Sequence, residues 1–179
     1  PANASAASTT IWGSSAPVGV TLDSDTNSVE LGTSFTPTLS GQATGIRFYK
    51  VKGASGTHTG TLWTRAGQKL AGVTFTNETT SGWQSAQLAG PVKLTAGQSY
   101  IVSYHVPRGG RYGATSYYSG TLGSATLPVG GAGLFTYCGS ASVPTSTWHA
   151  TQYWVDVTFA PSVAGSAAPT VSASPSASS

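Results

Sequence analysis

Closely spaced acids near the N-terminus are the first residues here that could do chemistry. Asp23 and Asp25 stand at alternate positions in LDSDTN, and Glu30 follows. Carboxylate and amide oxygens in a tight loop are the ligands that Ca²⁺ takes, but the EF-hand glycine and distal glutamate are missing, so spacing alone favours a solvated turn. Asp156 lies in the apolar stretch YWVDVTF, where an acid needs a partner. Because first and last strands of a sandwich can adjoin, we predict a structural Ca²⁺ site at Asp23, Asp25 and Asp156.

Aromatic residues outside the apolar runs form the second group. Rings in Gly-, Ser- and Thr-rich connections suit sugars, which stack on an aromatic face while hydroxyl and amide groups bind the sugar rim. An equally good alternative is that the rings close the ends of the fold. His105 and Arg111 would add polar contacts. The predicted ligand-binding set is Tyr112, Tyr117, Tyr118, Trp148, His105 and Arg111.

Catalytic signatures are absent from the sequence. It contains no HxH or HExxH arrangement and no G-x-S-x-G elbow, and its only acids are Asp23, Asp25, Glu30, Glu78 and Asp156. The single cysteine, Cys138, excludes an internal disulfide and a multi-thiolate zinc site. Because it follows two aromatic residues in LFTYC, it is interpreted as a buried small hydrophobe rather than a reactive thiol. We therefore predict that the chain is not an enzyme.

The composition points to an exported protein. Charged residues make up 7% of the chain, against about 25% in an ordinary soluble domain. The net charge of +3 is spread without the basic stripe that nucleic acid requires. The sequence has no apolar run long enough to cross a bilayer and no basic amphipathic helix. These features predict a secreted protein that neither binds nucleic acid nor inserts into a membrane.

Short apolar runs separated by turns must position these residues. Their two-residue period favours an all-β, antiparallel β-sandwich of the jelly-roll or immunoglobulin-like type. The strands are predicted at Ile11–Trp12, Val18–Leu22, Val29–Phe35, Gly45–Lys50, His58–Thr64, Lys69–Thr76, Gly82–Gln87, Val92–Leu94, Ser99–Val106, Leu134–Tyr137 and Tyr153–Phe159.

The chain divides into three predicted parts. Residues 1–10 are small and polar, and we expect a flexible segment, either the start of a mature chain after a signal peptide is removed or the remnant of a linker. Residues 11–161 form the sandwich. Residues 162–179 have the Pro/Ala/Ser composition of a disordered linker, which predicts that further modules of the same polypeptide, or a wall-attachment segment, follow it.

Four long motifs carry a resemblance to a known family. They are VELGTSFTPTLSGQATGIRFYK, GTHTGTLWTRAGQKLAGVTFTNETTSGWQ, PVKLTAGQSYIVSYHVPRGGRY and the terminal YWVDVTF. From about Val20 to Pro161 the chain resembles a family of bacterial secreted domains of unknown function, found beside immunoglobulin-like, carbohydrate-binding and polysaccharide-active modules. The resemblance implies a β-sandwich with an accessory role, and it implies no ligand or catalytic residue.

Three functions follow from these observations, in order of preference. The first is a non-catalytic accessory module that binds polysaccharide or cell-wall glycan through its loop aromatics. The second is a structural spacer or surface-display domain without a small ligand. A polysaccharide-active enzyme comes last.

Overall fold

The computed structural model describes residues 6–162, and within this range the chain is all-β and antiparallel, without a helix, as predicted. The strands are β1 (Thr9–Thr10), β2 (Thr21–Leu22), β3 (Val29–Phe35), β4 (Gly41–Lys50), β5 (Thr59–Thr64), β6 (Lys69–Thr74), β7 (Gly82–Leu94), β8 (Tyr100–Val106), β9 (Gly113–Ala114), β10 (Leu134–Tyr137) and β11 (Val155–Pro161).

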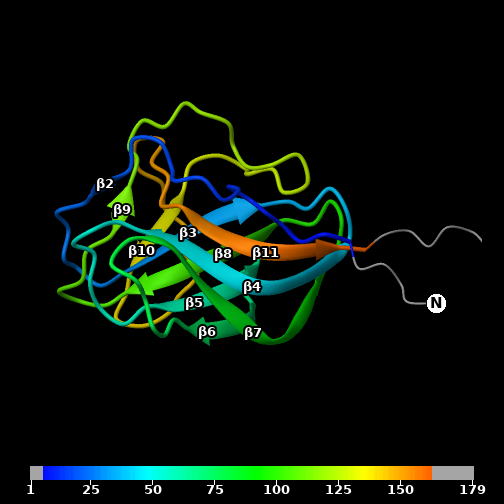
Figure 1. Ribbon diagram of the computed structural model, residues 1–179, viewed down its shortest axis with the longest axis horizontal. Coiled ribbons are helices and arrows are strands. Elements are labelled where there is room, and N and C mark those ends of the chain that lie inside the picture. The colour runs from blue at the N-terminus through cyan, green and yellow to red at the C-terminus, as the bar shows by residue number, and fades with distance from the viewer. Residues whose placement is uncertain (1–5, 163–179) are drawn as a thin grey trace, which may run out of the picture.

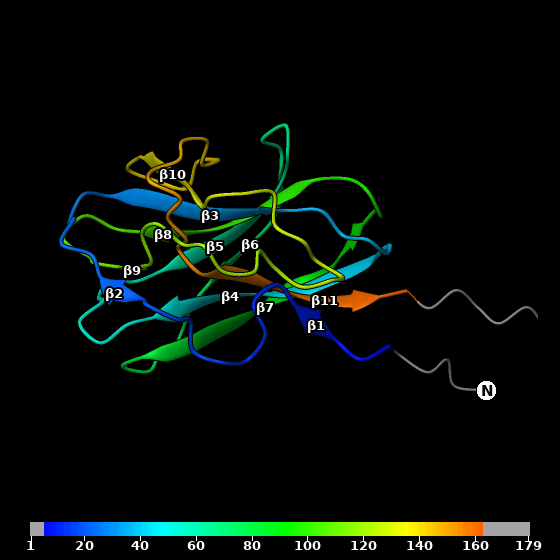
Figure 2. The same ribbon diagram turned by 90° about the horizontal axis from the view of Figure 1, so that it is seen from above.

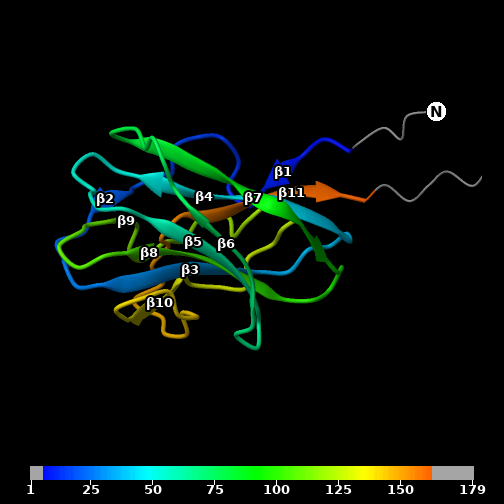
Figure 3. The ribbon, with the colours of Figure 1, turned by 90° about the horizontal axis from the view of Figure 1, so that it is seen from below.

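Two sheets pack face to face as a sandwich (Figures 1 and 2). One has four strands in the order β1-β11-β4-β7, and the other has five in the order β10-β3-β8-β5-β6. A small third sheet pairs β2 with β9. In Figure 3, β1 and β11 lie side by side, and Thr9 pairs with Phe159, so the first and last strands of the described range adjoin.

The core lies between the inner faces of the two sheets. Alternate residues of β8 point inward, so Val102 and Tyr104 join the core with Leu31 from β3. The Phe48 ring of β4 stacks on the Tyr104 ring, with a centroid separation of 4.3 Å, and so joins the two sheets. The aromatic side chains of Phe48, Phe75 and Phe159 are buried in this core.

The outer face of the five-stranded sheet is covered as well. All seven residues of β8 are buried, including Ile101, Ser103 and His105 on the outer face. Ile101 forms a second apolar cluster with Trp63 and Leu134, and Val143 from the connection after β10 packs against it. This covering connection makes the polar residues of the outer face part of the interior.

Several strand boundaries differ from those predicted. Gly82–Gln87 and Val92–Leu94 belong to one strand, β7, which continues through Pro91. Because β7 is an edge strand, a proline without an N–H group can face the free side. The strand expected at Ile11–Trp12 lies at Thr9–Thr10, and β9 was not predicted because its two residues carry no apolar pattern.

The predicted tails fall mostly beyond the described range. Of the N-terminal segment 1–10, residues 1–5 lie outside it, and of the linker 162–179 only residue 162 lies inside it. No helix within residues 6–162 has the length and apolar character needed to cross a membrane.

Candidate functional site

An aromatic pocket opens at the β10 edge of the sandwich, with a volume of about 370 Å³, within the range of small-ligand sites. Its walls come from the turn after β2, from β10 and from the connections around β9 and before β11. The lining residues are Asp23, Asp25, Tyr112, Ser116, Phe135, Tyr137, Trp148, Thr151 and Tyr153.

The aromatic rings of this pocket differ in exposure. Trp148 is 60% exposed and Tyr137 58% exposed, whereas Tyr112 and Tyr153 are buried. The two buried tyrosine rings meet edge to face with centroids 6.0 Å apart. The buried rings of Tyr112 and Tyr153 thus form the inner wall of the pocket, while the exposed rings of Tyr137 and Trp148 can contact a ligand.

The acids of the pocket are held in place by hydrogen bonds. Asp25 Oδ2 accepts a hydrogen bond of 2.8 Å from the Tyr137 hydroxyl, and Oδ1 accepts one of 2.9 Å from the Asn27 amide. The Asp25 amide donates in turn to Asp23 Oδ1 at 2.8 Å. Burial alone would raise the pKa of Asp25, but the bonds from Asn27 and Tyr137 outweigh it and lower the pKa, so this carboxylate is ionised at neutral pH.

Unusual backbone geometry accompanies the segment that carries Trp148. His149 and Ala150 both have positive φ, at 43° and 48°, as does Tyr117 at 54°. The Tyr117 amide donates to the His149 carbonyl oxygen at 2.8 Å, so these two loops are joined. Non-glycine residues in the left-handed region are uncommon and cluster at functional sites, so this geometry marks the rim of the aromatic pocket as a specialised turn.

The structure brings two of the predicted glycan-binding aromatics together, Tyr112 and Trp148. Tyr117 is 69% exposed but does not line the pocket, and its ring lies 5.0 Å from that of His149. Tyr118 belongs to a separate groove, where its ring meets Trp154 at 5.0 Å.

The two predicted polar contacts also lie elsewhere. His105 is buried on the outer face of the five-stranded sheet, where its Nδ1 lies 3.2 Å from Glu30 Oε2. Burial raises the pKa of Glu30 to about 7 and lowers the pKa of His105. Arg111 Nε donates to the Asp23 carbonyl oxygen at 2.8 Å, so Arg111 supports the turn behind the pocket.

Sequence reasoning missed several lining residues, above all Phe135, Tyr137 and Tyr153. Phe135 pairs with Leu31 of β3, and Tyr137 pairs with Val29. Leu31 and Val29 belong to the core, and paired residues point to the same face of a sheet, so Phe135 and Tyr137 would be expected to be buried as well. Because β10 is the edge strand, however, this face reaches the pocket, and Tyr137 is exposed. The one available signal was the alternation of rings in LFTYC.

Cys138 differs from its predicted state as a buried hydrophobe. It is half-buried, and its Sγ lies 3.4 Å from the Thr136 carbonyl oxygen and 4.0 Å from His105 Nδ1. The strand ends at Tyr137, so the following residue is only partly covered.

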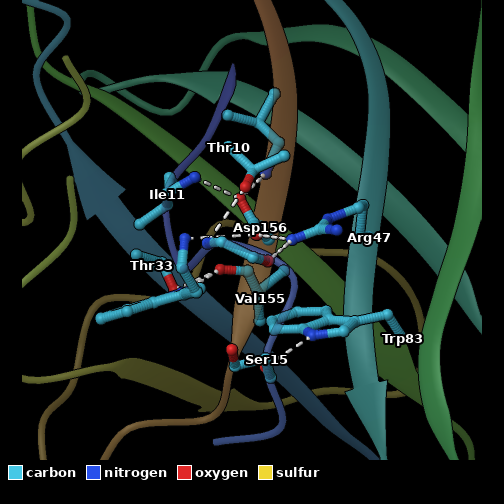
Figure 4. A network of polar contacts seen from close by, with 11 residues as sticks. Thr10, Ile11, Ser15, Thr33, Arg47, Trp83, Val155 and Asp156 are labelled. Atoms are coloured by element: carbon cyan, nitrogen blue, oxygen red, sulfur yellow. Dashed lines mark hydrogen bonds and ion pairs between the residues drawn. The ribbon is translucent and has the colours of Figure 1, made fainter. Parts of the chain in front are cut away.

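The three acids predicted to bind Ca²⁺ do not converge. Asp156 is fully buried and accepts hydrogen bonds from the Ile11 amide at 2.7 Å and from Arg47 Nη2 (Figure 4). Arg47 is its cross-strand neighbour on β4. Asp156 therefore has its partner in the four-stranded sheet, whereas Asp23 and Asp25 line the aromatic pocket.

Comparison with known proteins identifies a family. A family model described as a domain of unknown function, DUF4082, matches residues 14–155. The sequence matches none of the curated proteins with which it was compared.

Proposed function

We propose that this chain, which belongs to the DUF4082 family of domains of unknown function, is a non-catalytic module that binds carbohydrate in its aromatic pocket. The observation that carries this proposal is the joint placement of two exposed rings, Tyr137 and Trp148, beside the carboxylates of Asp23 and Asp25. A sugar offers weakly positive C–H groups on its faces and hydroxyl groups at its rim. The pocket offers complementary groups to both.

The rings would provide the stacking surface. The face of an aromatic ring carries partial negative charge, which attracts C–H groups, and Trp148 presents the larger face. Its exposure means that stacking would remove apolar surface from water without any rearrangement of the core.

The carboxylates would determine the kind of glycan. Asp25 is ionised and accepts hydrogen bonds, so it suits the hydroxyl groups of a neutral sugar. An acidic glycan would meet like charge at the same position, which costs free energy. We therefore infer a neutral polysaccharide or the neutral part of a cell-wall glycan as the ligand.

The pocket is also preorganised. Tyr137 is fixed by its hydrogen bond to Asp25, and Tyr112 is buried against Tyr153. Ordering side chains on binding costs about 0.5–1.5 kcal/mol for each flexible group, so a fixed pocket retains more of its contact energy.

We place the module in a secreted protein, attached to further modules through the Pro/Ala/Ser-rich linker. Support for this setting comes from the low content of charged residues and the linker composition. Its role would be accessory, holding a neighbouring module on an insoluble glycan.

The test is binding of the isolated chain to insoluble chitin, cellulose and peptidoglycan and to soluble starch. We expect retention on at least one of them, and Trp148→Ala and Tyr137→Ala should each weaken binding about tenfold, equal to about 1.4 kcal/mol. Tyr137→Phe keeps the ring but removes the bond to Asp25, so it should lose less than Tyr137→Ala. Tyr117→Ala is the matched control, because it removes an exposed tyrosine outside the pocket.

Two results would count against the proposal. Failure of the folded protein to bind any glycan on a broad array would favour a structural spacer or display domain. Undiminished binding by both pocket variants would place the glycan elsewhere, for example in the groove that contains Tyr118.

A further inference from the structure

Three different metal-binding side chains meet on the outer face of the five-stranded sheet. Glu30 of β3 stands directly opposite His105 of β8 in the strand register. On the other side of β3, Thr136 of β10 pairs with Glu30, and Cys138 lies two residues further along on the same face. The Cys138 amide donates to the Ser28 carbonyl oxygen at 3.1 Å, which continues the pairing to this point.

The ligand atoms of these three residues are close enough to share one ion. His105 Nδ1 is 3.2 Å from Glu30 Oε2 and 4.0 Å from Cys138 Sγ, and all three atoms lie within 4.8 Å of one another. Ligands of a tetrahedral zinc ion stand about 3.3–3.7 Å apart, given bond lengths of about 2.0–2.3 Å. Within residues 6–162, no other three His, Cys, Asp or Glu side chains converge in this way.

Glu30 lacks a cationic partner appropriate to its burial. Its exposure is 0%, and among the described residues no lysine or arginine forms an ion pair with it. Oε1 accepts a hydrogen bond from Ser103 Oγ, which itself accepts one of 2.7 Å from Trp63 Nε1. These bonds orient the carboxyl group. In its ionised form this group calls for an opposite charge, which a bound cation would supply.

The second ring nitrogen of His105, Nε2, contacts Ser28, which leaves Nδ1 available to bind a metal ion. Nε2 lies 3.1 Å from Ser28 Oγ, and this hydroxyl is 3.4 Å from the Val106 carbonyl oxygen. Both contacts are satisfied when Nε2–H donates to the hydroxyl and the hydroxyl donates to the carbonyl. The lone pair of Nδ1 then points toward Glu30 and Cys138, and the 3.2 Å contact with Glu30 Oε2 is a hydrogen bond donated by the protonated Glu30 carboxyl group. Metal-bound histidines have the same arrangement, with the second nitrogen donating a hydrogen bond.

The same contacts resemble the order of a Ser-His-acid triad, with Ser28 as the nucleophile. In such a triad the serine must donate its proton to the histidine. Here the Val106 carbonyl oxygen can only accept, so it competes for the single Ser28 proton. Ser28 is therefore better explained as the group that orients His105.

We propose that Glu30, His105 and Cys138 form a zinc-binding site. Imidazole and thiolate are ligands that Zn²⁺ takes and Ca²⁺ does not, and carboxylate oxygens also bind Zn²⁺. One carboxylate and one thiolate balance the two charges of the ion, so the buried cluster becomes neutral. Binding requires the Cys138 thiol, and the Glu30 carboxyl group where it is protonated, to release their protons to solvent.

Three protein ligands leave one position of a tetrahedral ion open. Ser28, His105, Arg108 and Cys138 line a groove of about 680 Å³, so solvent can reach the cluster. Tyr137 lines this groove and the aromatic pocket, and the two sites are therefore neighbours. Water or an oxygen of an incoming molecule could occupy the fourth position.

The experiment uses the reduced protein with Zn²⁺, and with Co²⁺ as a spectroscopic substitute. We expect one Zn²⁺ per chain by calorimetry, and an ultraviolet sulfur-to-cobalt charge-transfer band that Zn²⁺ removes. Cys138→Ser and His105→Gln should each weaken zinc binding more than about 100-fold, and Ser28→Ala about tenfold. Zinc should also protect Cys138 from alkylation by iodoacetamide.

Asp23→Asn is the control, since it alters an acid of the neighbouring pocket and should leave zinc affinity unchanged. Thermal unfolding of each variant establishes that it is folded. The proposal is overturned if the folded wild type shows no charge-transfer band. It is also overturned if folded His105→Gln retains wild-type affinity, which would mean that the thiol binds metal without this site.

Discussion

Arg47 and Asp156 form a buried ion pair across β4 and β11, with Asp156 fully buried and only 13% of the Arg47 side chain exposed. The Arg47 guanidinium lies 4.3 Å from the centroid of the Trp83 ring. Asp156 Oδ1 also accepts from the Ile11 amide at 2.7 Å. Asp156 of β11 thus connects Arg47 of the neighbouring strand β4 to Ile11 near the start of the fold.

Removal of Asp156 should strongly destabilise the protein. Asp156→Ala leaves Arg47 with an uncompensated charge and the Ile11 amide without its acceptor, and breaking a buried pair costs about 3–5 kcal/mol. Urea unfolding followed by tryptophan fluorescence would measure the loss in free energy of unfolding.

Lys93→Ala provides the control for this experiment, because Lys93 is exposed on β7. Its effect should remain within about 0.5 kcal/mol. If Asp156→Ala cost no more than Lys93→Ala, the ion pair would not be holding β1 against the sheet.

Gly32 should not tolerate a methyl group, because the connection after β10 packs directly on it. A Cβ at this position would lie 2.7 Å from Pro144 Cγ and 3.0 Å from the Val102 carbonyl oxygen. Gly32→Ala should therefore cost about 1–3 kcal/mol through overpacking. Chemical denaturation of the variant would measure this cost.

Gly90→Ala is the matched control in β7, where a Cβ would have no neighbour within 4 Å. It should be neutral or slightly stabilising, since alanine reduces the entropy of the unfolded chain. Equal stability of the two variants would mean that the covering connection moves aside freely.

The fold could be predicted from the sequence because its strands carry local signals. Val29–Phe35 and Leu134–Tyr137 are the observed strands β3 and β10, since alternating apolar residues and flanking turns define them. The long β7 was predicted as two strands because Pro91 breaks the pattern locally. Only its position at the sheet edge makes that proline acceptable.

The candidate sites depend on tertiary relationships that local patterns lack. Tyr112 and Trp148 were predicted from their turn-rich surroundings, but the exposure of Tyr137 follows from the edge position of β10. His105 and Glu30 are 75 residues apart in sequence and meet only through the β3–β8 register. Similarly, the sequence predicts that Asp156 binds a Ca²⁺ ion together with Asp23 and Asp25. In the structure, the pairing of β11 with β4 places Arg47 next to Asp156 instead.

Acid should destabilise the protein through His58, which is almost fully buried. Burial lowers the pKa of His58, although the adjacent Glu78 carboxylate, 2.8 Å from Nδ1, opposes this effect. The folded state thus binds the His58 proton less readily than the unfolded state, whose pKa is about 6.5. Stability from this group is present above pH 6.5 and is lost as the pH falls, by at most about 1.4 kcal/mol per pH unit.

Glu78 adds a second loss at lower pH. Burial alone would raise the pKa of Glu78, but hydrogen bonds from Lys50 and His58 outweigh it and lower the pKa. The contribution of Glu78 to the free energy of unfolding is therefore lost only as the pH falls below the ordinary glutamate pKa of about 4.3. Between pH 7 and pH 5 Glu78 therefore contributes little. Two other groups titrate in this range: His105, whose pKa burial also lowers, and Glu30, whose pKa burial raises to about 7 so that its contribution has the opposite sign.

His58→Gln separates this effect from the other titrating groups, because glutamine can still donate to Glu78 but does not titrate. The unfolding temperature of His58→Gln should fall less steeply between pH 7 and pH 5 than that of the wild type. His149→Gln, which alters an exposed histidine, should keep the wild-type slope. Parallel slopes for wild type and His58→Gln would show that His58 is not a source of the acid sensitivity.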